Sequence, residues 1–317
     1  MPETYVVTGA AGFIGSHIAE RLLRAGQRVR IIDNLLTGKR ENLEFLKSLG
    51  GDLSVTIGDV TDLDGLRAPF QNADYALHQA ALPSVPRSIA DPLETHRHCV
   101  TGTLNVLIAA RDAGVKRVVY AGSGSAYGDE SGGAKVESMS PAPISPYGVA
   151  KLAGEYYAAA FSRSYGLETV SLRYFNVFGP RQDPTSTYAA AIPKFITMML
   201  CGERPTIYGD GTQTRDFTYV DNIVHGNLLA CKAPRTAGET INLAVGGRIR
   251  ITDLVAELNA ILETDLAANH VDERPGDIKH SRAGIAKARD LLGFEPIVSF
   301  EEGLRRTVDW YRQQRLK

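Results

Sequence analysis

Short apolar runs rich in β-branched residues recur along the first half of the chain, and segments with apolar positions three or four residues apart lie between them. A short, continuous apolar run is typical of a strand buried on both faces of a sheet, whereas the wider spacing is typical of an amphipathic helix. The predicted strands are residues 5–7, 29–33, 53–57, 75–78, 117–121 and 169–173. The predicted helices are residues 16–25, 63–70, 101–113 and 146–165. This alternation predicts an α/β fold, a Rossmann-type doubly wound parallel sheet with helices on both faces.

The pattern changes after Gly179-Pro180, where irregular polar segments separate fewer elements. The later predicted elements are helices near 192–200, 251–262 and 300–313, and a strand at 241–244 that could rejoin the sheet. We therefore expect two domains with more than one crossing between them. The predicted Rossmann domain comprises residues 1–176 and 218–246, and the smaller, discontinuous α+β substrate domain comprises residues 177–217 and 247–317. Ligands of open α/β sheets bind beyond the carboxyl ends of the strands, where we place the second domain.

Composition excludes several classes of function. The 317 residues carry 35 basic and 36 acidic side chains, so a net charge of −1 supplies no global attraction for nucleic acid or an anionic membrane. No segment approaches the ~18 apolar residues of a membrane span, and the first residues lead into a strand rather than a signal peptide. Cys99, Cys201 and Cys231 are scattered and odd in number, which argues against a disulfide scaffold and for a reducing cytoplasm.

A glycine-rich turn joins the first predicted strand to the first helix. Gly9, Gly12 and Gly15 have the spacing of a dinucleotide-binding turn, in which glycine lets the backbone approach a pyrophosphate at a helix N-terminus. A plain tight turn is the alternative interpretation. Asp33, at the end of the second strand, favours the dinucleotide, because an acid there accepts hydrogen bonds from ribose hydroxyls and repels a 2′-phosphate. The pattern predicts NAD rather than NADP.

Ser123, Tyr147 and Lys151 form the second constellation. Tyr147 and Lys151 are four residues apart on a predicted helix, so they share a face, and a lysine cation stabilises a phenolate. Tyrosine then becomes usable as a general base near neutral pH. Ser123, near the end of the preceding strand, adds a hydroxyl that could share a proton with a substrate oxygen. A chance pair on an amphipathic helix is the alternative, which this order of residues after the glycine turn disfavours.

The sequence resembles the extended short-chain dehydrogenase/reductase family over essentially its whole length, and within it the nucleotide-sugar 4-epimerases. The likeness is greatest to bacterial UDP-N-acetylglucosamine 4-epimerases, which share the loop at 81–88. The matching segments are TGAAGFIGSH (8–17), IGDVTD (57–62), HQAA (78–81), ALPSVPRS (81–88), GSGSAYGD (122–129), SPYGVAK (145–151), LRYFNVFGPRQ (172–182), GDGTQTRDFTYVDN (209–222) and RPGDIKHS (274–281).

The resemblance implies the roles of individual residues. Tyr147 would remove the C4 hydroxyl proton of a UDP-sugar while hydride passes to a permanently bound NAD, and the 4-keto sugar would turn and be reduced on its other face. The implied NAD contacts are Gly9, Gly12, Phe13, Ile14, Gly15, Asp33, Asn34, Gly38, Asp59, Val60, Gln79, Ala80, Ala81, Tyr147, Lys151 and Tyr174. The implied substrate contacts are Ser84, Arg87, Ser123, Ser125, Tyr147, Asn176, Ile192, Tyr208, Arg215, Arg274, Asp277 and Ser281. A homodimer through helices 101–113 and 146–165 is also implied.

Two positions bear on the reaction and the sugar. Related dehydratases and decarboxylases carry acids where this chain has Gly124 and Ser125, so the resemblance favours simple epimerisation. Ser281 aligns with a position where a bulky tyrosine restricts relatives to UDP-glucose and UDP-galactose. A serine leaves room for a 2-acetamido group, which predicts UDP-GlcNAc and UDP-GalNAc as substrates without excluding the smaller sugars. A UDP-glucuronate 4-epimerase, decarboxylase or dehydratase is the alternative enzyme.

Cys99 departs from the family, which usually has asparagine at this position. A thiol is a poor substitute for an amide in hydrogen bonding. One interpretation is that Cys99 merely packs, and another is that activity or cofactor retention is altered; the latter is the motive for a third hypothesis, a non-catalytic NAD-sensing protein. His96 and His98 lack further ligands at metal-binding spacing, so we predict no metal site.

Overall fold

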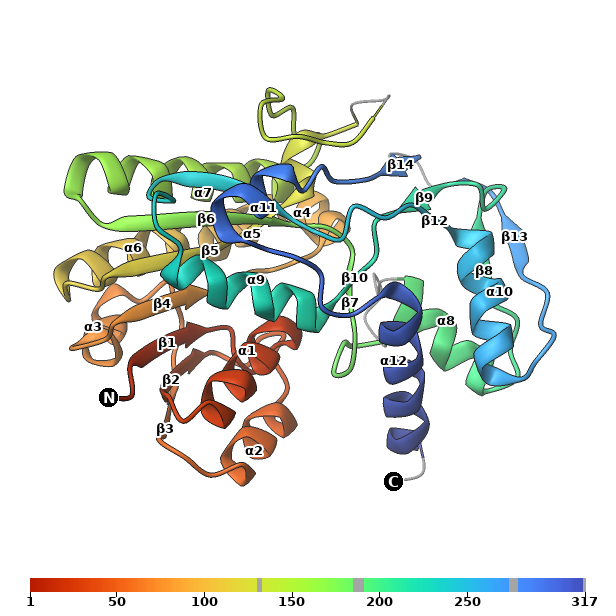
Figure 1. Ribbon diagram of the computed structural model, residues 1–317, viewed down its shortest axis with the longest axis horizontal. Coiled ribbons are helices and arrows are strands. Elements are labelled where there is room, and N and C mark those ends of the chain that lie inside the picture. Colours follow the sequence, from red (N-terminus) through yellow and green to blue (C-terminus); the bar gives the residue numbers. More distant parts are fainter. Residues whose placement is uncertain (130–132, 185–190, 274–278, 316–317) are drawn as a thin grey trace.

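A parallel sheet of seven strands forms the centre of the computed structural model, which describes residues 1–129, 133–184, 191–273 and 279–315 (Figure 1). Its order is β11 (Glu239–Leu243), β6 (Glu168–Tyr174), β5 (Arg117–Ser123), β4 (Tyr75–His78), β1 (Thr4–Thr8), β2 (Arg28–Asp33) and β3 (Leu53–Ile57). The order reverses direction at β1 and β4, which is the switch point where doubly wound sheets bind ligands. The predicted fold class is confirmed, and the late strand does rejoin the sheet.

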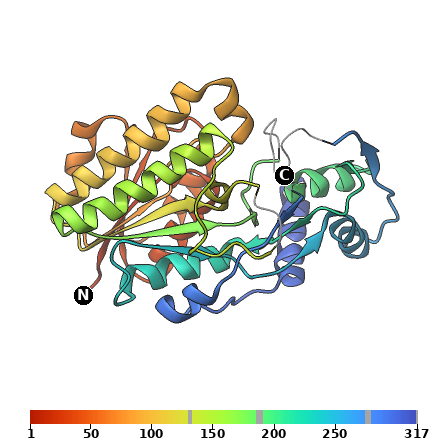
Figure 2. The same cartoon turned by 90° about the horizontal axis from the view of Figure 1, so that it is seen from above.

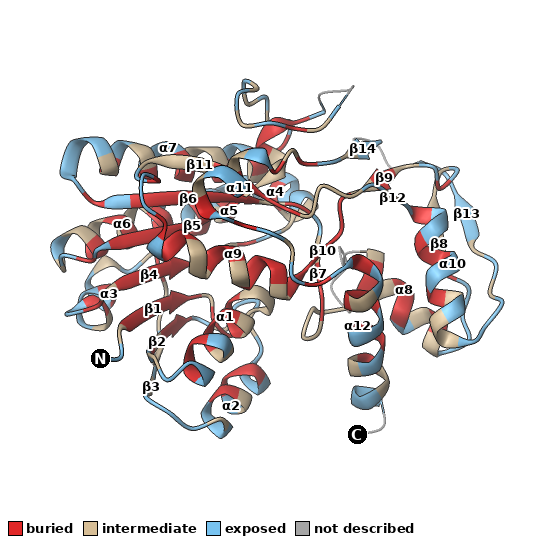
Figure 3. Ribbon diagram, viewed as in Figure 1, coloured by how far each residue is buried: buried red, intermediate tan, exposed pale blue. Residues whose placement is uncertain are grey.

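Helices cover both faces of the sheet, as Figure 2 shows. Successive strand residues point to opposite faces, so Val7 packs with the helices of one face and Val6 with those of the other, both fully buried. Figure 3 shows the resulting buried layer along the strands. The first face carries α1 (Phe13–Arg24), α2 (Arg40–Ser48) and α9 (Val220–Lys232). The second carries α3 (Leu63–Phe70), α6 (Gly102–Asp112) and α7 (Pro146–Tyr165).

A smaller lobe lies beyond the carboxyl ends of the strands (Figures 1 and 2). Its helices are α8 (Ala191–Leu200), α10 (Ile251–Leu262) and α12 (Phe300–Arg315). Its strand pairs are β7 (Val177–Phe178) with β10 (Thr218–Tyr219), and β8 (Thr206–Tyr208) with β13 (Asn269–Val271). A third small sheet holds β9 (Thr214–Arg215) between β12 (Ile249–Arg250) and β14 (His280–Ser281). Helix α11 (Ala286–Leu292) packs instead against β11 and α9. The exact division into two domains stays a proposal.

Several helices were not anticipated from the sequence. The spacing of apolar residues does not predict α9, because two polar residues, Asn222 and Asn227, are fully buried on it. Asn222 satisfies its amide by donating to the Val298 carbonyl at 2.8 Å, a contact made by a distant segment. The other unanticipated helices are α2, α4 (Val85–Ala90), α5 (Pro92–His96) and α11. None of the helices within the described residues is both long and apolar enough to cross a membrane.

Candidate active site

The glycine turn leads from β1 into α1 at the centre of the sheet. Gly9 has φ +72°, and a Cβ there would stand 2.6 Å from the Ala80 nitrogen. A Cβ on Gly15 would stand 2.3 Å from the Gly9 carbonyl oxygen, so glycine is required at both positions. Gly12 caps α1 without any side chain on the free amides, and Phe13 and Ile14 form the first turn. The open helix N-terminus suits a pyrophosphate.

Asp33 ends β2 beside this turn. Its carboxylate accepts hydrogen bonds from the Ala11 nitrogen at 2.9 Å and the Leu35 nitrogen at 2.8 Å. Burial raises the pKa of Asp33, and these two amides oppose the rise. Gly38 lies against it, because a Cβ at position 38 would come within 2.9 Å of an Asp33 oxygen. The turn and the acid therefore form one site that fits the pyrophosphate and ribose of NAD.

Further predicted cofactor residues line the ends of neighbouring strands. Asn34 donates to the Asp59 carboxylate at 2.9 Å, which joins the ends of β2 and β3. Tyr174 donates to Gln79 at 3.1 Å and to Asn227 at 3.0 Å, which joins β6, β4 and α9. The remaining predicted residues on this side are Val60 after β3 and Ala80 and Ala81 after β4.

Ser123, Tyr147 and Lys151 come together at the carboxyl end of β5. Ser145 caps α7 by accepting from the Gly148 nitrogen at 3.1 Å, which sets Tyr147 and Lys151 on its first two turns. Lys151 donates to the Ala121 carbonyl on β5 at 2.8 Å, and its ammonium is 6.0 Å from the centre of the Tyr147 ring. The Ser123 side chain is near enough to Tyr147 to lower the pKa of its phenol. The three residues therefore form one constellation.

Burial is the largest cause of the pKa shifts of Tyr147 and Lys151. It raises the pKa of Tyr147, the neighbouring Cys99 adds to the rise, and the Ser123 side chain opposes it. Burial lowers the pKa of Lys151, and the charges of Cys99 and Glu155 oppose that fall. In the protein alone, the phenol therefore holds its proton more tightly than the sequence argument expects.

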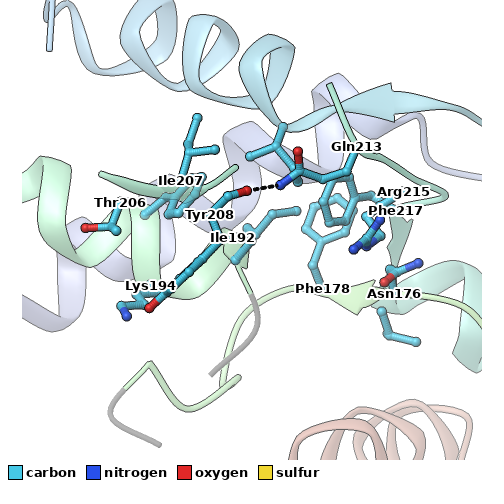
Figure 4. A pocket seen from close by; sticks show the side chains of 14 residues that line it. Asn176, Phe178, Ile192, Lys194, Thr206, Ile207, Tyr208, Gln213, Arg215 and Phe217 are labelled. Carbon is cyan, nitrogen blue, oxygen red and sulfur yellow. Dashed lines mark hydrogen bonds between the residues drawn. The ribbon is translucent and has the colours of Figure 1, made fainter. Parts of the chain in front are cut away.

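A cavity lies beyond these residues and is lined by Asn176, Ile192, Tyr208 and Arg215 from the predicted substrate set (Figure 4). Gln213 donates to the Tyr208 carbonyl at 2.8 Å and braces one wall. Asn176 has φ +35°, a strained backbone for a residue other than glycine, and such strain gathers at functional sites. Residues that the sequence places far apart thus share one cavity.

Ser281 pairs in register with Arg215 in the small sheet of β9 and β14. The adjacent Asp216 is fully buried, and its carboxylate accepts from the nitrogens of Gly246 at 3.1 Å, Gly247 at 3.2 Å and Ala283 at 3.1 Å. Burial raises the pKa of Asp216 to about 6 against the effect of these amides. Asp216 thus ties three distant segments around Arg215. Arg274 and Asp277 lie outside the described residues.

Three predicted substrate residues have structural partners. Ser84 caps α4 by accepting from the Arg87 nitrogen at 3.2 Å. The Arg87 guanidinium makes a bidentate pair with Glu94, with contacts of 2.8 and 3.0 Å. Ser125 donates to the Ser123 hydroxyl at 2.8 Å, so it acts beside the catalytic group.

Cys99 lies in a π-helical turn, η1 (Arg97–Thr101), just before α6. Its sulfur is buried and accepts from the Leu82 nitrogen at 3.4 Å, and it packs with Leu82, Val100 and Ala150. This is the packing role of the first interpretation.

Sequence reasoning missed Asp216, Asn227, and the buried pair of Glu155 and Arg173. The signals were weak: Asp216 follows Arg215 directly, and Glu155 is one helical turn after Lys151. Neither spacing distinguishes a buried polar contact from a solvated one.

The glycine turn, Asp33 and the Ser123, Tyr147 and Lys151 group define an enzyme of the extended short-chain dehydrogenase/reductase class. The chain belongs to the NAD dependent epimerase/dehydratase family, whose model matches residues 5–244. NAD is therefore the dinucleotide of this site.

Three similar proteins extend this finding. A putative UDP-glucose 4-epimerase of Methanocaldococcus jannaschii is 35% identical over 97% of this chain and 98% of its own. The structure of a UDP-N-acetylglucosamine 4-epimerase from Methanobrevibacter ruminantium M1, in complex with UDP-N-acetylmuramic acid, is 43% identical with a TM-score of 0.94, and the match covers 99% of this chain and 100% of that one. A UDP-glucuronic acid 4-epimerase from Bacillus cereus, in complex with UDP-glucuronic acid and NAD, is 34% identical with a TM-score of 0.91 over 98% and 99% of the two chains.

Proposed function

We propose that the chain is a cytoplasmic UDP-sugar 4-epimerase that interconverts UDP-GlcNAc and UDP-GalNAc and also accepts UDP-Glc and UDP-Gal. The observation that carries the proposal is the meeting of Ser123, Tyr147 and Lys151 beside the dinucleotide turn, with the cavity of Asn176 and Arg215 beyond them. All three cysteines are unpaired, which supports the cytoplasmic assignment.

Each residue has a role that its position supports. NAD, held by the glycine turn and Asp33, would supply the hydride acceptor and donor for sugar C4. Tyr147 accepts the proton of the C4 hydroxyl, Ser123 holds that oxygen, and Lys151 stabilises the phenolate. Arg215 binds the diphosphate, so that the sugar can turn while the nucleotide stays in place.

The two residues after Ser123 carry no acidic side chain, which favours epimerisation over elimination. A Cβ on Gly124 would stand 2.9 Å from the Phe175 ring, so an acidic side chain at this position meets the ring. Ser125 is engaged with Ser123 and carries no acid. The acids that a dehydratase or decarboxylase would use are absent from these two positions.

The choice of a 2-acetamido sugar rests on Ser281 and on similarity. Paired residues of parallel strands project to the same face, so Ser281 and Arg215 face the same side of their small sheet. A serine hydroxymethyl group beside the diphosphate-binding arginine leaves volume for an acetamido group. The 43% identical UDP-N-acetylglucosamine 4-epimerase supports the same choice.

The test is incubation of the purified holoenzyme with UDP-GlcNAc, UDP-GalNAc, UDP-Glc, UDP-Gal and UDP-glucuronate, each followed by NMR and mass spectrometry. We expect UDP-GlcNAc and UDP-GalNAc to reach one equilibrium mixture at unchanged mass. Turnover of UDP-glucuronate alone would favour the alternative that the Bacillus cereus structure represents. Loss of carbon dioxide or water would identify a decarboxylase or dehydratase, and tight NAD binding without any turnover would identify a binding protein.

We further propose that the chain forms a homodimer through the surface around α7. Apolar side chains are exposed there on three helices that pack together, α4, α5 and α7. They include Ile89, Leu93, Val149 and Tyr156, of which Leu93 is 81% exposed. Exposed apolar side chains gathered on neighbouring helices are typical of an interface. Light scattering of the purified protein is expected to give the mass of two chains, and a monomer would contradict it.

A further inference from the structure

A buried ion pair begins on α7, one helical turn after Lys151. Glu155 and Arg173 have side-chain exposures of 2% and 5%. The Arg173 Nε donates to the two Glu155 oxygens at 3.0 and 3.1 Å, and a terminal nitrogen donates to one of them at 2.7 Å. The guanidinium also lies 4.4 Å from the centre of the Tyr127 ring. Taking two charges out of water is costly, so such a pair in this place calls for a reason.

The position of the Glu155 carboxylate is set from two sides. Glu155 is four residues after Lys151 on α7, so the two side chains share a helix face. Gly122 is paired in register with Arg173 on the neighbouring strand. A Cβ on Gly122 would stand 2.8 Å from a Glu155 oxygen, so the absence of a side chain there makes room for the carboxylate. The carboxylate is therefore held against Arg173 and Gly122, on the helix face that also carries Lys151.

Because Lys151 is buried, its ammonium needs a nearby negative charge to remain protonated. It is 3% exposed, and its ammonium donates to the neutral Ala121 carbonyl. His78 is fully buried, its pKa falls to about 3 through burial and the charge of Lys151, and so it stays neutral. Glu155 is the one carboxylate among the described groups that face the lysine. Those titratable or charged groups are Tyr147 and Glu155 on α7, Tyr120 on β5, Cys99 on η1, His78 on β4 and Arg173 on β6.

We propose that Glu155, seated over Gly122 and held by Arg173, is a positioning residue that keeps the Lys151 ammonium charged in its buried site. Glu155 contacts neither the reacting atoms nor the cofactor in this role, and it acts through Lys151. Burial raises the pKa of Glu155, while its hydrogen bonds with Arg173 and the charges of Arg173 and Lys151 oppose that rise. With Glu155 ionised, the three buried groups carry one net positive charge, which a Tyr147 phenolate can neutralise.

The inference rests on the proposed role of Lys151, but its first test needs no substrate. Lysines labelled with ¹³C at the ε position are titrated by NMR in the NAD-bound enzyme, and the Lys151 signal is assigned by its loss in Lys151→Arg. In Glu155→Gln, which keeps the shape and an acceptor for Arg173, we expect Lys151 to lose its proton at least about one pH unit lower than in the wild type. An unchanged Lys151 titration in a folded Glu155→Gln protein would overturn the proposal.

A matched control lies on the same two strands at their other end. Arg117 of β5 pairs with Glu168 of β6, with the Arg117 Nε donating at 2.9 Å. Glu168→Gln breaks an arginine–glutamate pair between the same two strands, half exposed and at their other end, and it should leave the Lys151 titration unchanged. If Glu155→Gln does not fold, the same titration of Lys151 is measured in Gly122→Ala. The added Cβ displaces the Glu155 carboxylate without removing its negative charge. We expect a smaller shift in the same direction, and no shift would contradict the proposal.

Catalysis supplies the second measurement. The alkaline limb of kcat should move to lower pH in Glu155→Gln by the same amount as the Lys151 titration, because removal of a negative neighbour lowers the pKa of an ammonium. A loss of kcat that is equal at every pH, with no movement of the limb, would indicate a purely structural role. If the wild-type enzyme turns over no UDP-sugar, the proposed function fails, and the NMR titration still decides the role of Glu155.

Discussion

The dinucleotide turn and Asp33 come from one continuous stretch of chain, whereas the substrate side of the active site is assembled from segments far apart in the sequence. The glycine turn and Asp33 belong to a single β1–α1–β2 unit, in which the Ala11 amide of the turn and the nearby Leu35 amide donate to Asp33. Arg215, in contrast, sits in a small sheet with β12 and β14, and Asp216 ties that sheet together. Local backbone geometry builds the first side, and long-range contacts build the second. Substitutions should therefore affect the two sides separately.

The catalytic group lies between the two sides, and its loss should spare both. Tyr147→Phe removes the proposed general base but keeps the ring, so we expect kcat to fall by about 10²–10⁴-fold. NAD content and UDP binding should remain near wild type, as measured by absorbance of the released cofactor and by calorimetry. Epimerisation that continues at the wild-type rate would show that Tyr147 is not the base.

Arg215→Ala tests the substrate side. Loss of a charge-assisted contact to the diphosphate costs about 1.5–3 kcal/mol, which corresponds to a roughly 10- to 150-fold weaker affinity for UDP. Calorimetry with UDP measures the change, and the amount of bound NAD should not change. Arg250→Ala, an exposed arginine on the neighbouring strand β12, is the matched control. A parallel loss of NAD would show that the two sides are coupled.

Ser281→Tyr sharpens the substrate side further. A tyrosine beside Arg215 should fill the volume assigned to the acetamido group, which lowers kcat/KM for UDP-GlcNAc by about tenfold or more. Turnover of UDP-Glc should change less, because the smaller sugar does not need that volume. Ser281→Thr, a smaller change, should have little effect on either sugar. Equal losses for both sugars would mean that position 281 does not select the substituent at C2.

Asp33→Asn tests the cofactor side, with the smallest expected effect. The amide oxygen can still accept one hydrogen bond, but the charge that repels a 2′-phosphate is lost. We expect the preference for NAD over NADP to fall by about tenfold, a change of about 1.4 kcal/mol. Competition binding of the two dinucleotides measures it, while the affinity for UDP should stay the same. An unaltered preference would show that another group excludes the 2′-phosphate.

Much of the cofactor side could be predicted because its determinants are local. The glycine spacing, the short buried strands and the cap at Ser145 each act within a few residues. Helix α9 could not be predicted in this way, since Asn222 is buried on it and is satisfied only by the distant Val298 carbonyl. A buried polar residue whose hydrogen-bond partner lies in a distant segment leaves no periodic pattern in the sequence.

The sequence by itself determined the parallel sheet, the dinucleotide turn and the order of Ser123, Tyr147 and Lys151, because backbone geometry and helical spacing follow from neighbouring residues. Only the tertiary structure decided that Arg215 lines a cavity with Asn176, that Asp216 gathers three segments, and that Glu155 faces both Arg173 and Gly122. The physical reason is burial: a charged or polar side chain is stable inside the protein only with partners, and those partners come from strands that the fold brings together.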